Sequence, residues 1–205
     1  MRKILLTITC LFILSNISVV FASEGQPFVN PVDQVIIDNT KVISNNPSDA
    51  IAYCKRGNAY RAKKQYDLAF NDLNKAIEIN PNYAYAYFSR GYFYGTKENI
   101  DSAIEDYSKA IEINSNYTLA YNNRGSMYRK KGQYDLSIND LNQAIELNPK
   151  YTLAYNNLGQ VYEKKALYQE AIDAYRKLIL NATLPQDKIF VDGAQNKILE
   201  LGGTL

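Results

Sequence analysis

One spacing constrains the fold of this chain more than any other feature: Gly57, Gly91, Gly125 and Gly159 lie 34 residues apart. A tyrosine precedes each of these glycines by four residues, and another follows it by three. Small residues recur at the same spacing; they are Ala69, Ala103, Ser137 and Ala171, and then Ala76, Ala110 and Ala144. A motif that returns at a fixed period of about 20–50 residues is typical of proteins built from stacked copies of one structural unit.

Each unit has the apolar spacing of two helices. In the first unit, the later helix has a broad apolar stripe that contains Leu73, Ala76 and Ile77. A short polar join, residues 63–65, separates it from the earlier helical segment. Asn80-Pro81 closes the unit, because proline cannot continue a helix. We therefore expect an all-α fold in which every unit contributes two antiparallel helices.

The repeated stretch, residues 50–185, resembles tetratricopeptide (TPR) repeats, since several positions per unit match in four consecutive copies. The resemblance implies an α-solenoid of four TPR units at 50–83, 84–117, 118–151 and 152–185. Two places depart from the family pattern. Tyrosine replaces the usual tryptophan at the fourth place, and Arg56, Arg90 and Arg124 replace the common leucine at the seventh. TPR arrays are binding scaffolds, so the resemblance implies a non-catalytic role in protein–protein interaction.

Helical spacing also extends beyond both ends of the repeats. Residues 23–49 combine a linker with a leading helix between Val32 and Asn45. Residues 186–205 contain a last amphipathic helix, in which Gly193 keeps the 34-residue phase. Because repeat arrays need terminal caps, we expect these segments to be N- and C-terminal capping helices.

The first 22 residues have the pattern of a secretory signal peptide. Arg2 and Lys3 precede an uncharged apolar stretch, and Val20-Phe21-Ala22 forms a cleavage site ahead of Ser23. We therefore expect an exported protein, periplasmic or secreted, with no membrane insertion after signal cleavage. The alternative is a membrane anchor formed by uncleaved residues 4–22, because about 17–25 apolar residues can span a bilayer.

Composition argues against several functional classes. The chain has 23 basic and 21 acidic residues, so the loss of Arg2 and Lys3 leaves equal numbers and disfavours a nucleic-acid partner. It has no histidine and no nucleophile or phosphate-loop motif, so we expect no catalysis, metal or cofactor. Acidic residues recur in the second helices of the first three units, and we expect them on a solvated face; they are Asp72, Glu78, Asp106, Glu112, Asp140 and Glu146.

The tyrosines indicate where a partner binds. Of the 18 tyrosines, only Tyr85 and Tyr92 fall outside the recurring pattern, and Phe88 shares their helical face. The resemblance implies that the second, fifth, ninth and twelfth places of each first helix line a concave groove. The expected partner-binding residues are Asn58, Arg61, Tyr85, Phe88, Tyr92, Asn122, Ser126, Arg129 and Asn156. The rival interpretation is that the three aromatic side chains pack against neighbouring helices.

The functional hypothesis is a scaffold or adaptor that holds a partner polypeptide in this groove through an apolar anchor. The alternatives are a structural or self-associating envelope component and an accessory subunit of a cell-envelope complex. Self-association would use the array ends or Cys54, the only cysteine left after signal cleavage. A lone cysteine is otherwise a small half-buried apolar residue.

Overall fold

The computed structural model describes residues 29–204, so the expected signal segment, residues 1–22, lies outside the described part. Within that part the chain forms ten α-helices and one short 3₁₀ helix, with no strand. The leading helix is α1 (Pro31–Asn45). Four pairs follow: α2 (Ala50–Ala62) with α3 (Tyr66–Ile79), α4 (Ala84–Thr96) with α5 (Ile100–Ile113), α6 (Thr118–Lys130) with α7 (Tyr134–Leu147), and α8 (Thr152–Lys164) with α9 (Tyr168–Asn181). The chain then forms η1 (Pro185–Asp187) and α10 (Lys188–Glu200).

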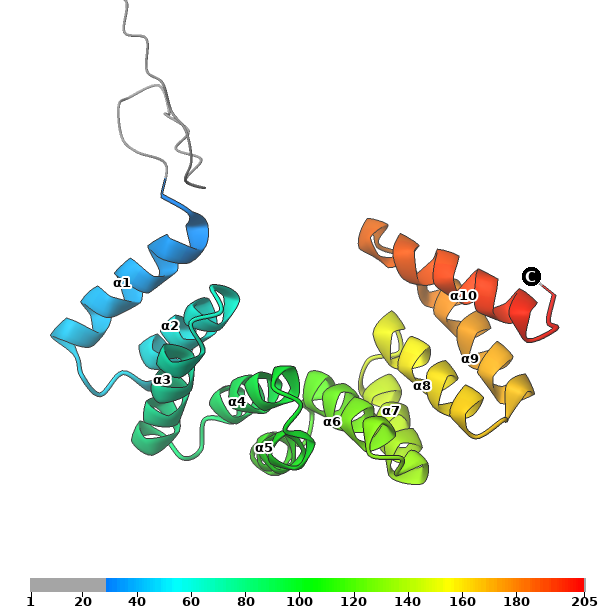
Figure 1. Cartoon of the computed structure of the whole chain (residues 1–205), viewed down its shortest axis with the longest axis horizontal. Helices are drawn as coiled ribbons and strands as arrows, with labels where there is room; N and C mark the ends of the chain where they lie inside the picture. The colour runs from blue at the N-terminus through cyan, green and yellow to red at the C-terminus, as the bar shows by residue number, and fades with distance from the viewer. Residues whose placement is uncertain (1–28, 205) are drawn as a thin grey trace, which may run out of the picture.

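The helix pairs follow one another along an arc, with α1 and α10 at its two ends (Figure 1). The two helices of a pair contact each other, and the first helices of neighbouring pairs also meet, as α2 meets α4 and α6 meets α8. The predicted all-α solenoid of antiparallel pairs is therefore confirmed.

An asparagine ends the second helix of a repeat. The Oδ1 atoms of Asn46, Asn80, Asn114 and Asn148 each accept a hydrogen bond from the backbone N–H two residues later, at 3.0–3.2 Å. This is an asparagine turn, which competes with continuation of the helix. It explains why α5 ends at the same place in its unit as α3 and α7 do, although Ser115 occupies the place of the proline found in the first and third units.

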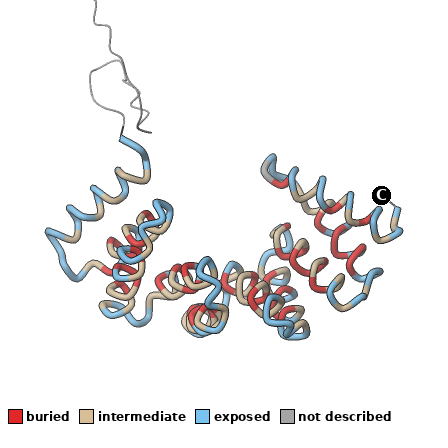
Figure 2. The backbone as a smooth tube through the Cα atoms, in the orientation of Figure 1, coloured by how far each residue is buried: buried red, intermediate tan, exposed pale blue. Residues whose placement is uncertain are grey.

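Buried residues occur on both helices of each pair (Figure 2), and the core also joins neighbouring pairs, since Leu73 of α3 and Phe93 of α4 belong to one cluster. Within a pair the two helices approach each other closely. The recurring glycines permit this contact. A Cβ atom at Gly159 would lie 2.5 Å from Cε1 of Tyr175, and one at Gly125 would lie 3.0 Å from Cγ of Leu141. By contrast, a Cβ atom at Gly193 would meet nothing within 4 Å, because no helix follows α10 in the described residues.

The two ends of the array are covered to different degrees. Helix α10 buries Ala194 and Ile198 against the last repeat. Helix α1 has no fully buried residue, and Val35, Ile37 and Val42 on it are between 39% and 53% exposed. No helix within residues 29–204 has the length and apolar character needed to cross a membrane.

Three of the recurring acidic residues are not on a solvated face, which corrects the sequence interpretation. Asp72, Asp106 and Asp140 are only 5–7% exposed, whereas the glutamates six residues later are exposed. Each aspartate accepts two hydrogen bonds, at 2.7–2.8 Å, from the arginine that stands 16 residues earlier. The pairs are Arg56 with Asp72, Arg90 with Asp106, and Arg124 with Asp140.

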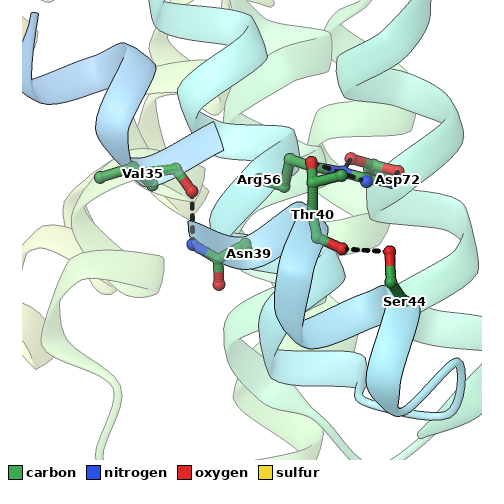
Figure 3. A network of polar contacts seen from close by, with 6 residues as sticks. All are labelled: Val35, Asn39, Thr40, Ser44, Arg56 and Asp72. Atoms are coloured by element: carbon green, nitrogen blue, oxygen red, sulfur yellow. Dashed lines mark hydrogen bonds and ion pairs between the residues drawn. The ribbon is translucent and has the colours of Figure 1, made fainter. Parts of the chain in front are cut away.

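Each arginine also reaches the preceding second helix. In Figure 3, Arg56 extends from α2 to Asp72 on α3 and to Thr40 on α1, whose Oγ1 accepts a bond of 3.2 Å from Nη1. The Nη1 atoms of Arg90 and Arg124 donate in the same way to Asn74 and Ser108. The hydrogen-bonded carboxylate raises the pKa of the Arg56 and Arg90 guanidinium groups. Each arginine thus joins three helices.

The fourth repeat replaces both members of the ion pair. Leu158 stands at the place of the arginine and Ala174 at the place of the aspartate, and both are buried in one apolar cluster. Removing only one member would leave a poorly solvated charge, which is strongly unfavourable, whereas removing both is often nearly neutral. The fourth repeat is therefore a natural double substitution of the pair.

We predict that Gly159→Ala and Gly193→Ala have opposite effects on stability. Gly159→Ala should lower the free energy of unfolding by about 1–2 kcal/mol, because overpacking against Tyr175 outweighs the gain in helix propensity. Gly193→Ala should raise it by up to about 1 kcal/mol, since its new methyl group meets open space. Urea unfolding followed by circular dichroism measures both, and equal shifts of the two midpoints would contradict the assigned contacts.

We also predict that Asp106→Asn lowers the free energy of unfolding by about 1.5–3 kcal/mol, because the part-buried Arg90 loses its charged partner. The double variant Arg90→Leu/Asp106→Ala copies the fourth repeat and should recover most of that loss. Urea unfolding of the three proteins tests this. A double variant no more stable than Asp106→Asn would show that the pair itself is strongly stabilising.

Candidate polypeptide-binding surface

An open groove lies where α1 meets the first repeat. We call it the α1–α2 groove; its volume is about 720 Å³, and its lining includes Val32, Val35 and Val42 from α1, Asn58, Ala59 and Ala62 from α2, and Tyr85 from α4. Two of the predicted site residues, Asn58 and Tyr85, therefore lie in one cavity. The lining is mainly apolar, as is usual for sites that bind an apolar side chain.

The repeat phase explains why this groove is open. Helix α1 stands 34 residues before α3, so Val35 and Val42 occupy the places of Ala69 and Ala76. Both alanines are fully buried in the first repeat, whereas Val35 and Val42 are 39% and 40% exposed. In a complete unit a first helix would cover this face. No such helix precedes α1 within residues 29–204, and in that part of the chain this face is exposed.

The three aromatic residues of α4 divide between surface and core. Tyr85 and Tyr92 are each 42% exposed. Phe88 is half-buried, with its ring centroid 5.0 Å from that of Tyr117 and 5.8 Å from that of Tyr107. Phe88 therefore fits the rival interpretation, in which the aromatic side chains pack against neighbouring helices. Tyr85 and Tyr92 are the members of the predicted patch that a ligand can reach.

Two arginines offer hydrogen-bond donors that the array does not use. The guanidinium of Arg61 lies 4.4 Å from the ring centroid of Tyr92. At this distance the aromatic ring attracts the positive charge of the guanidinium. Its Nε atom is buried and has no hydrogen-bond partner in the described part of the chain, and the same holds for Nε of Arg129. Neither arginine forms an ion pair with a residue between 29 and 204. Because these Nε atoms are closed to solvent, only the terminal amino groups of the two half-buried arginines could donate to the oxygen atoms of a ligand.

A smaller hollow of about 230 Å³ lies between these arginines along the repeat order. Tyr92, Gly95, Tyr107, Ser126 and Met127 contribute to its lining. Gly95 stands at the twelfth place of its unit, where the first and third units carry Arg61 and Arg129. The predicted residues Tyr92 and Ser126 therefore share one cavity, which the missing side chain at Gly95 helps to keep open.

The fifth place of the first helices contributes packing more than surface. Cys54 is fully buried, and Asn122 is 1% exposed. The Oδ1 atom of Asn122 accepts a bond of 2.9 Å from Nδ2 of Asn157, which links α6 to α8. The resemblance to TPR repeats implied that Asn122 faces the groove, but this place turns toward the neighbouring first helix. Asn156, at the same place in α8, is half-exposed because no repeat of two helices follows it.

Asn58 has a mixed position, because it lines the α1–α2 groove while its amide is already engaged. Its Nδ2 atom donates to Oγ of Ser89 at 2.9 Å. The Oδ1 atom of Asn58 accepts no hydrogen bond from any side chain or backbone group in the described residues. A ligand donor could use this oxygen atom without breaking the contact to α4.

Comparison with protein families supports one assignment. Models of the TPR repeat match residues 57–98 and 125–165, and further tetratricopeptide repeat models match residues 84–117, 107–139 and 153–181. The matches run without a gap from residue 57 to residue 181. The chain belongs to the tetratricopeptide repeat family. A comparison with curated protein sequences gives no match.

Solved structures with the same fold include other TPR proteins. MamA superposes with a TM-score of 0.66 at 24% identity, over 75% of this chain and 95% of MamA. YrrB, described as a TPR protein with an unusual peptide-binding site, gives a TM-score of 0.65 at 22% identity, over 80% and 84%. TTC0263, a thermophilic TPR protein of Thermus thermophilus, gives 0.67 at 19% identity, over 82% and 91%. At these identities the likeness shows the fold, and the TPR array is that of a protein-interaction scaffold.

The environment of Cys54 leads to a prediction for the TPR array. Burial raises the pKa of its thiol to about 11, so the reactive thiolate is scarce at neutral pH. We predict that, in the chain from Ser23 onward, where Cys54 is the single cysteine, a disulfide reagent modifies the native protein at least about a hundredfold more slowly than the urea-unfolded protein at pH 8. Absorbance of the released thiol measures both rates. Similar rates would show that Cys54 is accessible and would support the hypothesis of self-association through a disulfide between two chains.

Proposed function

We propose that this TPR array is an exported, non-catalytic adaptor that holds a segment of a partner polypeptide. Export rests on the signal-like pattern of residues 1–22. The observation that carries the binding proposal is the α1–α2 groove, an apolar cavity of about 720 Å³ on the exposed face of α1. A partner segment would place an apolar side chain there, against Val35 and Tyr85.

The charges near the groove indicate a second property of that segment. Arg61 follows the groove along α2, and its guanidinium lies beside Tyr92 with no hydrogen-bond partner for its buried Nε atom among residues 29–204. Arg129 repeats this feature two units later. A segment with an apolar anchor followed by carboxylate or carbonyl oxygen atoms would satisfy both contacts. Aromatic and arginine side chains often dominate the binding energy of such interfaces.

Self-association through the array ends is less favoured by the charges. A head-to-tail contact would complete a repeat, because α10 has the phase of a first helix and α1 that of a second helix. In that repeat Asp192 would stand at the place of Arg56 and Asp38 at the place of Asp72. Two carboxylates would then meet where the internal repeats hold an ion pair, which is unfavourable.

The test is a selection of peptides from a displayed random library on the purified protein, followed by fluorescence-anisotropy titration of the enriched sequences. We predict a consensus with one large apolar residue near an acidic residue or a C-terminal carboxylate. Tyr85→Ala and Arg61→Ala should each weaken binding by about 30-fold, the equivalent of roughly 2 kcal/mol for a hot-spot residue.

Tyr168→Ala is the matched control, since Tyr168 is a 53% exposed tyrosine at the start of α9. It should bind the same peptides with unchanged affinity. Circular dichroism and thermal unfolding would establish that the three variants keep the fold. Peptides that bind all variants equally would place the interaction elsewhere, and the absence of any enriched sequence would oppose the adaptor role.

A further inference from the structure

The first three repeats each hold a guanidinium group between two tyrosines. Its Cζ atom lies 5.5–6.0 Å from the ring centroids of the tyrosines at the fourth and eleventh places of the unit. In the third unit these residues are Tyr121, Arg124 and Tyr128. The paired aspartate and a polar residue of the preceding second helix complete the cation's surroundings. The array therefore builds the same guanidinium site three times.

The fourth repeat keeps most of this site without its cation. Tyr155 and Tyr162 remain at the fourth and eleventh places, while Leu158 and Ala174 replace the arginine and the aspartate. Asn142 stands where Asn74 and Ser108 accept hydrogen bonds from Arg90 and Arg124. The smaller side chains leave a hollow of about 340 Å³, lined by residues that include both tyrosines, Leu158, Ala174 and Asn142. We call it the fourth-repeat slot.

The rim of this slot has carboxylates of its own. Glu170 and Asp173, both on α9, contribute to the lining. Asp173 is already engaged, because its Oδ1 atom accepts a bond from Gln169 at 3.2 Å and lies 3.7 Å from Nη1 of Arg176. The side chain of Glu170 forms neither an ion pair nor a hydrogen bond with any other residue between 29 and 204. Lys177, also in the lining, likewise has no ion pair there.

We propose that the fourth-repeat slot binds an arginine side chain of a partner polypeptide. The guanidinium would lie between Tyr155 and Tyr162, donate to Asn142 and pair with Glu170. Arginine suits the slot better than lysine, because its planar group can contact aromatic rings and donate in several directions at once. This site is separate from the α1–α2 groove, so its occupancy does not depend on the function proposed for that groove.

Methyl and aromatic NMR spectra of the full chain can test the proposal with two end-blocked tripeptides, Gly-Arg-Gly and Gly-citrulline-Gly. Citrulline has nearly the same shape as arginine and no charge. Gly-Arg-Gly should shift the methyl signals of Leu158 and Ala174 and the ring signals of Tyr155 and Tyr162. The affinity for the citrulline peptide should be at least about fivefold lower, as expected when a cation–aromatic contact is lost.

Two variants separate the slot from other surfaces. Leu158→Arg/Ala174→Asp restores the pair found in the first three repeats, so it should fill the slot and abolish the arginine-dependent shifts. Glu170→Gln changes only an exposed side chain and should weaken Gly-Arg-Gly binding by about three- to fivefold. The second variant decides the matter if the first does not fold.

Four results would overturn the proposal. Equal affinities for the arginine and citrulline peptides would show that the charge of the guanidinium does not contribute to binding. Arginine-dependent shifts that persist in a folded Leu158→Arg/Ala174→Asp protein, or that avoid Leu158 in the unsubstituted protein, would place binding elsewhere. An unchanged affinity of the Glu170→Gln variant for Gly-Arg-Gly would show that Glu170 does not pair with the bound guanidinium.

Discussion

The close approach of the two helices in each pair is the contact on which the rest of the structure depends. It requires that the first helix carry no side chain at its eighth place, because a Cβ atom there would lie within 3.2 Å of the second helix in all four repeats. This approach brings the arginine at the seventh place within reach of the aspartate 16 residues later. The next helix pair can then pack against this one, so the same geometry repeats along the arc.

The arginines make the repeats depend on one another. Each of the first three arginines bonds to an aspartate within its own unit and to a polar residue of the second helix before it. Loss of one unit would therefore expose a part-buried charge in the next. The fourth repeat is joined to the third by apolar contacts of Leu158 and by the hydrogen bond that the side chain of Asn157 donates to that of Asn122. Its connection is thus chemically different from the three before it.

The 34-residue period predicted the fold, because every copy indicates the same helix pair. The exposure of Tyr85 and Tyr92 could also be predicted, because these two tyrosines depart from the period. The buried aspartates were missed although a signal existed, since arginine and aspartate disappear together in the fourth unit. The contact between Arg61 and Tyr92 could not be predicted in this way. It joins different places in consecutive units, and Gly95 and Glu163 show that the twelfth place does not keep its chemistry.

The difference between the two ends of the array determines where further contacts can form. Helix α10 covers the last repeat with Ala194 and Ile198 and leaves Asp192 exposed, but Ile189 and Leu199 on it are also 74% and 55% exposed. Helix α1 presents valines at places that are buried alanines in the first repeat, so its open face is apolar. A partner helix or strand could gain apolar burial at either end, but at the α1 end the exposed valines also line a groove of about 720 Å³. A segment with an apolar anchor in this groove would have the rest of its length directed along the arc toward Arg61 and then Arg129, because both arginines follow the groove in the order of the repeats.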